Sequence, residues 1–105
     1  MTSQSFIQEL TQFGKQILPT NSSLWLYGSR ARNQARQDSD WDILILLDKE
    51  KRDITDWNTY CWPFNDFGFE KNQYVSPKLF TRTEWQTMQA APFAQNVEQD
   101  KIVLV

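Results

Sequence analysis

The feature that most constrains the fold is an apolar run from Trp41 to Leu47, which only Asp42 interrupts. A strand with one face in water shows alternating polar and apolar residues, whereas a strand covered on both faces is apolar throughout. The run therefore predicts a central strand that is buried on both sides. Helices packed on both faces of a sheet supply such cover, as in an α/β (α+β) fold.

Other segments carry shorter patterns of the same two kinds. Apolar residues recur every three or four positions before Pro19, and Leu24–Tyr27 is a short buried strand that ends at Gly28. Pro77 indicates that its strand lies at an edge or contains a bulge, since proline cannot donate to the ladder. The predicted helices span Ser3–Leu18, Ser29–Ala35, Ile54–Trp62 and Thr83–Ala90. Pro63 is expected to end the third of these helices, and Glu84 to cap the last. The third strand is predicted over Gln73–Phe80, and Asn96–Val105 is expected to form a last strand or a docking segment.

Length and charge narrow the classes of protein. The 105 residues predict a single domain spanning 1–105, and a net charge of −2 makes binding of extended nucleic acid unlikely on electrostatic grounds. Cys61 is the only cysteine and there is no histidine, so no disulfide, cysteine zinc site or histidine proton shuttle is expected. No apolar run approaches the roughly 20 residues of a membrane span, which predicts no membrane association and a cytoplasmic location.

A Gly-Ser turn follows the strand Leu24–Tyr27. Gly28 lets a phosphate approach the backbone, Ser29 adds a hydroxyl donor, and the amides that open the next helix carry partial positive charge. Arg30 or Arg32 can neutralise phosphate oxygens, and Arg36 lies near enough to contribute. Which arginine faces the ligand stays open. The turn predicts nucleotide-binding residues at Gly28, Ser29, Arg30 and Arg32.

Two aspartates open the central strand. Asp40 and Asp42 are two positions apart, so in extended backbone their side chains leave from the same face. Two carboxylates so placed can share Mg²⁺ or Mn²⁺ with a nucleoside triphosphate, and metal-assisted displacement needs no histidine base. We therefore predict Asp40 and Asp42 as metal ligands and catalytic residues. Trp41 between them points to the opposite face and packs in the core.

Gly28-Ser29 followed by Asp40 and Asp42 resembles the motif of the polymerase-beta-type nucleotidyltransferase superfamily, specifically its minimal (MNT-like) members. The resemblance is strong over Leu24–Leu47 and weaker over Gln73–Trp85. It implies the nucleotidyltransferase fold, with a small mixed sheet flanked by helices. It also implies Mg²⁺-dependent transfer of a nucleoside monophosphate from a nucleoside triphosphate, with ATP as the expected substrate. It also implies a HEPN-type helical partner protein and an antitoxin role.

The chain departs from the family at one position. The resemblance implies a third carboxylate from the next core strand, and this sequence has Gln73, Tyr74 and Val75 there. We assign the position to Tyr74, a neutral phenol that is a poor ligand for Mg²⁺. Glu70 can substitute only if the strand begins earlier.

Two functions thus remain open. The first is a transferase that acts on an acceptor hydroxyl, and the second is a catalytically impaired nucleotide-binding or partner-binding module that has lost transfer with its third carboxylate. A third reading, an RNA-binding domain, is disfavoured by the acidic balance. The aromatic residues predict a core rather than a base-stacking platform, and these are the five tryptophans Trp25, Trp41, Trp57, Trp62 and Trp85 together with Phe64, Phe67 and Phe69.

Overall fold

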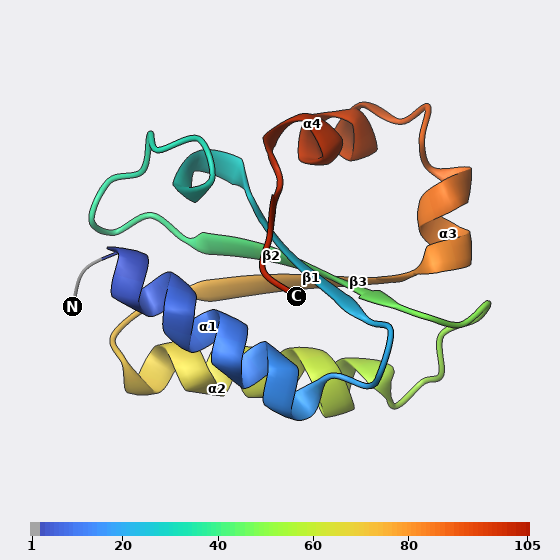
Figure 1. Ribbon diagram of the computed structural model, residues 1–105, viewed down its shortest axis with the longest axis horizontal. Helices are drawn as coiled ribbons and strands as arrows, with labels where there is room; N and C mark the ends of the chain where they lie inside the picture. Colours follow the sequence, from blue (N-terminus) through green and yellow to red (C-terminus); the bar gives the residue numbers. More distant parts are fainter. Residues whose placement is uncertain (1–2) are drawn as a thin grey trace.

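The computed structural model describes residues 3–105 and is built around a four-stranded sheet in the order β3-β2-β1-β4. The strands are β1 (Ser23–Tyr27), β2 (Trp41–Leu47), β3 (Val75–Thr81) and β4 (Ile102–Val103). β1 runs antiparallel to β2 and β4, and β2 runs parallel to β3 (Figure 1). The mixed sheet and its flanking helices confirm the predicted fold class.

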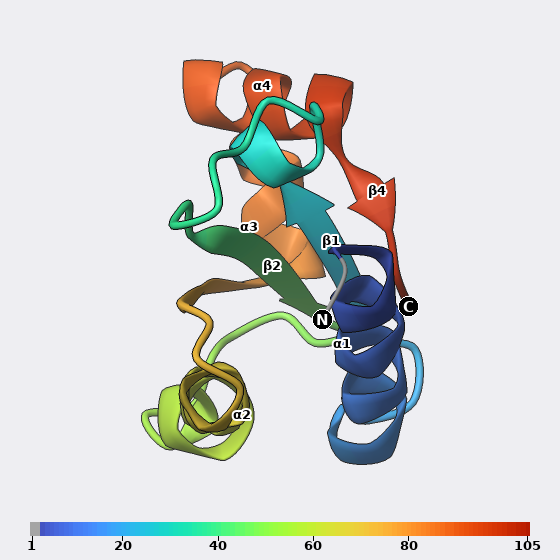
Figure 2. The same ribbon diagram turned by 90° about the vertical axis from the view of Figure 1, so that its left-hand side faces the viewer.

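Helices cover both faces of this sheet. α1 (Ser3–Ile17) and α2 (Trp62–Glu70), with the π-helical turn η2 (Trp57–Cys61) before α2, lie on one face, whereas α3 (Arg82–Thr87) and α4 (Pro92–Asp100) lie on the other (Figure 2). Within residues 3–105, no helix is both long enough and apolar enough to cross a bilayer.

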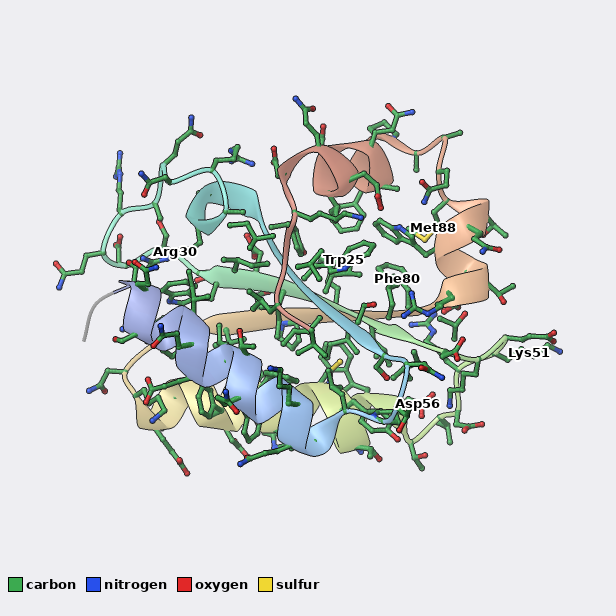
Figure 3. The ribbon with its side chains drawn as sticks, in the orientation of Figure 1. Trp25, Arg30, Lys51, Asp56, Phe80 and Met88 are labelled. Atoms are coloured by element: carbon green, nitrogen blue, oxygen red, sulfur yellow. The ribbon has the colours of Figure 1, made fainter. Side chains whose placement is uncertain are left out.

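The alternation of side chains along the strands divides the core in two. Trp41, Ile43 and Ile45 pack under α1 and α2 against Phe6 and other residues. The opposite face packs against α3 and α4, and Figure 3 shows Trp25, Phe80 and Met88 gathered there. The buried set on this second side includes Trp25, Tyr27, Leu44, Leu46, Trp85, Ala94 and Val97.

Several sequence predictions are confirmed. The apolar run forms β2 over the predicted residues, in an interior position, and β3 with its proline lies at the edge of the sheet. Trp41 is buried and its ring centroid lies 4.7 Å from that of Phe6. Cys61 is fully buried, and burial raises the pKa of its thiol to about 12, as expected of an inert thiol.

The helix predicted over Ser29–Ala35 is wrong. The chain forms only the short 3₁₀ turn η1 (Gly28–Arg30), followed by irregular turns. Gly28 has φ of +76° and Asn33 has φ of +58°, and such left-handed residues at both ends of the segment stop an α-helix from forming. Phosphate binding here therefore cannot draw on the dipole of a full helix.

The second half of the chain also differs from the prediction. Pro63 does not end a helix but lies in the first turn of α2, where a missing N–H is tolerated. α3 begins after Thr81, whose hydroxyl accepts from the amide of Glu84 while the Glu84 carboxylate accepts from the amide of Thr81. Glu84 is therefore a helix cap as predicted, but of α3, since α4 follows and only Ile102–Val103 form a strand.

Three aromatic residues assigned to the core are on the surface. The exposed fractions are 45% for Trp57, 55% for Trp62 and 76% for Phe69. All three belong to η2 and α2, whose opposite side packs on the sheet through Cys61 and Phe64. One helical stretch thus presents aromatic side chains to the core and to solvent.

Candidate active site

The Gly-Ser turn and the second aspartate are in contact. In the β1–β2 register Tyr27 lies opposite Asp42, so the turn that follows β1 passes directly over this carboxylate. A Cβ atom at Gly28 would lie 2.5 Å from the Asp42 Oδ2 atom. The glycine is therefore required twice, by its left-handed φ and by the carboxylate beside it.

The half-buried Asp42 has a perturbed pKa. Burial raises its pKa above the usual aspartate value, the nearby Asp40 charge raises it further, and Lys78 and Arg32 act in the opposite direction. Burial, together with the Asp42 charge, also raises the pKa of the Tyr27 phenol well above its usual range. The Asp40 charge thus opposes ionisation of Asp42, and a bound cation would relieve that repulsion.

The two predicted phosphate-binding arginines, Arg30 and Arg32, lie on opposite sides of the sheet. Arg32 lies on the Asp42 side, where its Nη1 atom is 2.7 Å from Asp100 Oδ2 of α4. Arg30 lies over the ring of Trp41, at 4.2 Å from the centroid, and so on the α1 side of the sheet. The Arg30 Nη2 atom donates to the carbonyl oxygens of Gln37 and Ser39. The structure thus brings Arg32, and not Arg30, to the face of the sheet that carries Asp42.

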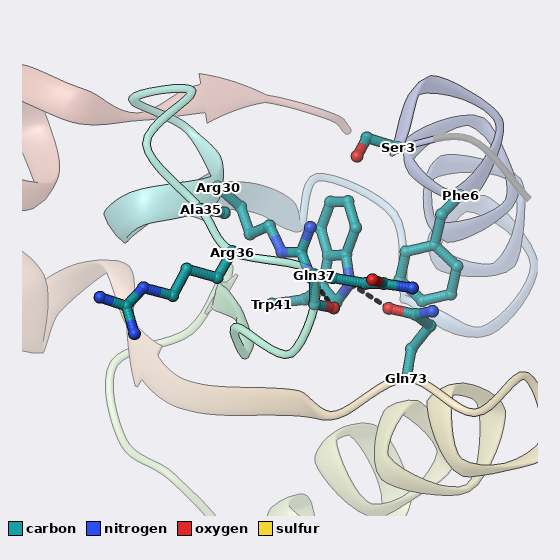
Figure 4. Close-up of a pocket in the computed structure, with 8 residues that line it drawn as sticks. All are labelled: Ser3, Phe6, Arg30, Ala35, Arg36, Gln37, Trp41 and Gln73. Carbon is teal, nitrogen blue, oxygen red and sulfur yellow. Dashed lines mark hydrogen bonds between the residues drawn. The ribbon is translucent and has the colours of Figure 1, made fainter.

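Arg30 borders a cavity that is separate from the aspartate pair. This cavity of about 310 Å³ lies beside α1, with Arg36, Gln37, Trp41 and Gln73 among its lining residues (Figure 4). Trp41 Nε1 donates to Gln73 Oε1 across it, at 2.8 Å. Trp41 faces away from Asp42 in the strand, so the cavity and the carboxylates are on opposite faces of the sheet.

The structure does not place Tyr74 opposite Asp42. Ser76 of β3, and not Tyr74, lies opposite Asp42 in the parallel register. Tyr74 precedes β3, its side chain is 71% exposed, and its carbonyl accepts from the Trp41 amide. Glu70 ends α2 on the α1 side of the sheet, so it cannot take this place either.

Lys78 is a site residue that the sequence analysis missed. It follows Ser76 by two positions, so both side chains leave the α3 and α4 face of β3, as does Asp42 from β2. Lys78 is exposed, and its side chain makes no hydrogen bond or ion pair within residues 3–105. The alternation of Val75, Pro77 and Leu79 with polar residues was the pattern that could have revealed it.

The donor set fits a divalent cation that is shared with a ligand. Over residues 3–105 there is no group of three or more histidine, cysteine or acidic side chains that could hold a metal alone. Asp40 and Asp42 supply two carboxylates, and Mg²⁺ commonly takes one or two carboxylates together with substrate phosphates and water. The geometry therefore suits a cation that arrives with a triphosphate.

Comparisons with known proteins agree with this architecture. The profile of the family "Polymerase beta, Nucleotidyltransferase" matches residues 6–64. Among solved structures, a toxin-antitoxin with AMP-PNP is similar with a TM-score of 0.64 and 16% identity, covering 94% of this chain and 72% of that one.

A mutant of the toxin-antitoxin MntA-HpeT is similar with a TM-score of 0.62 and 14% identity, covering 94% of this chain and 71% of that one. No curated protein sequence gives a significant match. At these identities the solved structures establish the fold, whereas the profile spans more than half of the sequence and includes Gly28, Ser29, Asp40 and Asp42. The chain therefore belongs to the polymerase beta-type nucleotidyltransferase family.

Proposed function

We propose that this chain binds ATP together with Mg²⁺ or Mn²⁺ and transfers the nucleoside monophosphate to a hydroxyl group of a partner protein. Asp40 and Asp42 hold the cation, and Gly28 and Ser29 receive the triphosphate. The family assignment supports the reaction class, and the placement of the four residues supports their roles.

The observation that carries the proposal is the contact between Gly28 and Asp42. Because the position of a Gly28 Cβ is only 2.5 Å from Asp42 Oδ2, a phosphate lying on the turn is within reach of a cation on the carboxylate. A turn without a ligand has no need for a half-buried aspartate beneath it, whose burial disfavours its charge. Carboxylates whose ionised form is disfavoured by burial are typical of functional sites.

The transfer step is an in-line displacement. The acceptor oxygen forms a bond to the α-phosphorus, the bond from this phosphorus to the bridging oxygen breaks, and pyrophosphate leaves. When bound, the divalent cation neutralises charge on the phosphate oxygens. A carboxylate of the aspartate pair accepts the hydroxyl proton, so the chain needs no histidine.

In this proposal two basic side chains, those of Arg32 and Lys78, bind the remaining phosphate charge. Arg32 is held beside the site by Asp100, and Lys78 extends from β3 on the same face as Asp42. A lysine ammonium is a point charge suited to phosphate. In this proposal Lys78 offsets phosphate charge from the strand on which the family places its third carboxylate. Arg30 contributes only if it leaves the ring of Trp41.

The two similar solved structures support the proposal of a protein partner. Both solved structures are described as toxin-antitoxin proteins, and one of them contains a nucleotide analogue. We therefore propose an antitoxin role in the cytoplasm, in which the acceptor hydroxyl belongs to a HEPN-type helical toxin.

A second candidate is a module that binds nucleotide or partner without transfer. The observation that favours it is the composition of β3, where the side chains on the Asp42 face are Ser76, Lys78 and Phe80 and none is acidic. Loss of one metal ligand removes transition-state stabilisation while ground-state binding can persist.

Label transfer separates the two candidates. Wild-type protein is incubated with α-labelled ATP, Mg²⁺ or Mn²⁺ and the candidate toxin, alongside Asp42→Asn. The transferase requires label on the toxin that disappears in the variant. Binding of ATP or of the toxin without label transfer identifies the module, and absence of transfer together with absence of both kinds of binding contradicts both candidates.

A further inference from the structure

An apolar groove lies on the surface opposite the aspartate site. Five of the large hydrophobic residues that are exposed in residues 3–105 belong to the segment from 54 to 74. A groove of about 390 Å³ runs between α2 and the start of β3, and we call it the α2–β3 groove; it is lined by Trp62, Asn65, Asp66, Phe69, Gln73 and Tyr74. Exposed aromatic side chains gathered at one groove are typical of a binding surface.

The spacing along α2 gives the groove one continuous wall. Trp62, Asn65, Asp66 and Phe69 stand at positions i, i+3, i+4 and i+7, which is a single helical face. Tyr74, 71% exposed, forms the other side. An apolar helix face beside a second wall matches the way grooves receive an amphipathic helix.

The edge of β3 disfavours a strand as the occupant. The carbonyl of Val75 accepts from Asn65 Nδ2, and the carbonyl of Leu79 accepts from Arg52 Nη1. Pro77 lies between them and has no N–H to donate. An added strand would therefore meet two carbonyls that are already hydrogen-bonded and one missing amide.

Charge disfavours a symmetric contact between two copies of the chain and favours a basic partner. Asp66 and Glu70 stand one turn apart on α2, both exposed, and neither has an ion pair in the described chain. The nearby Lys71 is engaged by Glu9 at 3.4 Å. A symmetric contact would set the acids of one groove against those of the other, and like charges facing each other oppose association.

We propose that the α2–β3 groove docks a basic amphipathic helix of a partner protein, with its apolar side chains on Trp62, Phe69 and Tyr74 and its cations beside Asp66 and Glu70. The inference rests on the proposed function only for the expectation of a protein partner. It places the docking surface on the face of the sheet that α1 and α2 cover, away from Asp42. A docked partner therefore leaves Asp42 open to ATP.

Fluorescence anisotropy with labelled peptides at physiological salt tests the proposal. The probes are a leucine/lysine peptide with helical spacing, a leucine/glutamate peptide with the same spacing, and a leucine/lysine peptide that alternates as a strand. The helical basic peptide is expected to bind at least tenfold more tightly than the other two. Asp66→Lys and Phe69→Ser should each weaken its binding at least tenfold, whereas Glu50→Lys, an exposed and unpaired acid elsewhere, should not.

Other results overturn the proposal. Equal weakening by Asp66→Lys and Glu50→Lys would mean binding by overall charge, and tighter binding of the strand peptide would mean edge addition. Self-association of wild-type protein that Phe69→Ser abolishes would assign the groove to a second copy. The peptide measurement needs no nucleotide, so it stands apart from label transfer, and circular dichroism confirms that each variant is folded.

Discussion

Gly28→Ala is the perturbation whose cost follows most directly from the structure. An alanine must hold φ near +76°, which costs roughly 1–2 kcal/mol. Its methyl group must also displace the Asp42 carboxylate from 2.5 Å, and overpacking of this kind costs about 1–3 kcal/mol. We expect the free energy of unfolding to fall by roughly 2–5 kcal/mol, the sum of both terms.

A double-mutant cycle separates the two terms. In an Asp42→Ala background the contact with the carboxylate is gone, so Gly28→Ala should cost only the backbone part, about 1–2 kcal/mol. Urea denaturation of the four proteins measures the difference. Gly14→Ala, whose Cβ would meet Leu24 and not Asp42, is the control and should be additive with Asp42→Ala. Equal costs of Gly28→Ala in both backgrounds would refute the contact between turn and carboxylate.

Three further predictions address phosphate binding, helix capping and acid stability. Lys78→Gln should weaken binding of ATP about tenfold while leaving binding of adenosine unchanged. Lys51 is an exposed lysine outside the site, so Lys51→Gln should change the binding of neither ligand. Titration calorimetry measures the binding of ATP and of adenosine. Thr81→Ala removes the cap of α3 and should lower the free energy of unfolding by about 1–2 kcal/mol in urea, whereas the serine variant keeps most of it. Hydrogen bonds to Asp56 from Lys49 and from a backbone amide outweigh its burial and lower its pKa, so its stabilisation is present above the unfolded value and is lost as the pH falls through the folded value. The free energy of unfolding, measured from neutral to strongly acidic pH, should therefore vary less with pH in Asp56→Asn than in the wild-type protein. An unchanged pH dependence would contradict this role of Asp56.

The elements that could be predicted from sequence are those that local patterns determine. The run over β2 and the periodicity of α1 are complete within their own segments. β2 formed at the predicted residues, and α1 ends one residue before the predicted Leu18. The family motif is also local, so Gly28 and Asp42 were found together. The missing helix after Gly28 shows the limit, since positive φ at Asn33 depends on the path to β2 and not on helix propensity.

The parts of the site that could not be predicted depend on register and rotamer. Ser76 rather than Tyr74 faces Asp42 because β3 pairs in parallel with β2, a relation that no local pattern encodes. Arg30 and Arg32 are alike in sequence, yet packing on Trp41 takes Arg30 to the other face. Exposure of Phe69 likewise depends on which side of α2 meets the sheet.

The central claim is that a divalent cation and a triphosphate occupy one place between the turn and the aspartates. Paramagnetic broadening by Mn²⁺ in the presence of ATP, recorded on backbone amide signals, locates the ion. The account predicts that signals of Gly28, Asp42 and Ser76 broaden first and that Asp42→Asn abolishes the effect, while Leu10 and Phe64 stay sharp. Broadening centred on Gln37 and Gln73, or none at any residue, would contradict it.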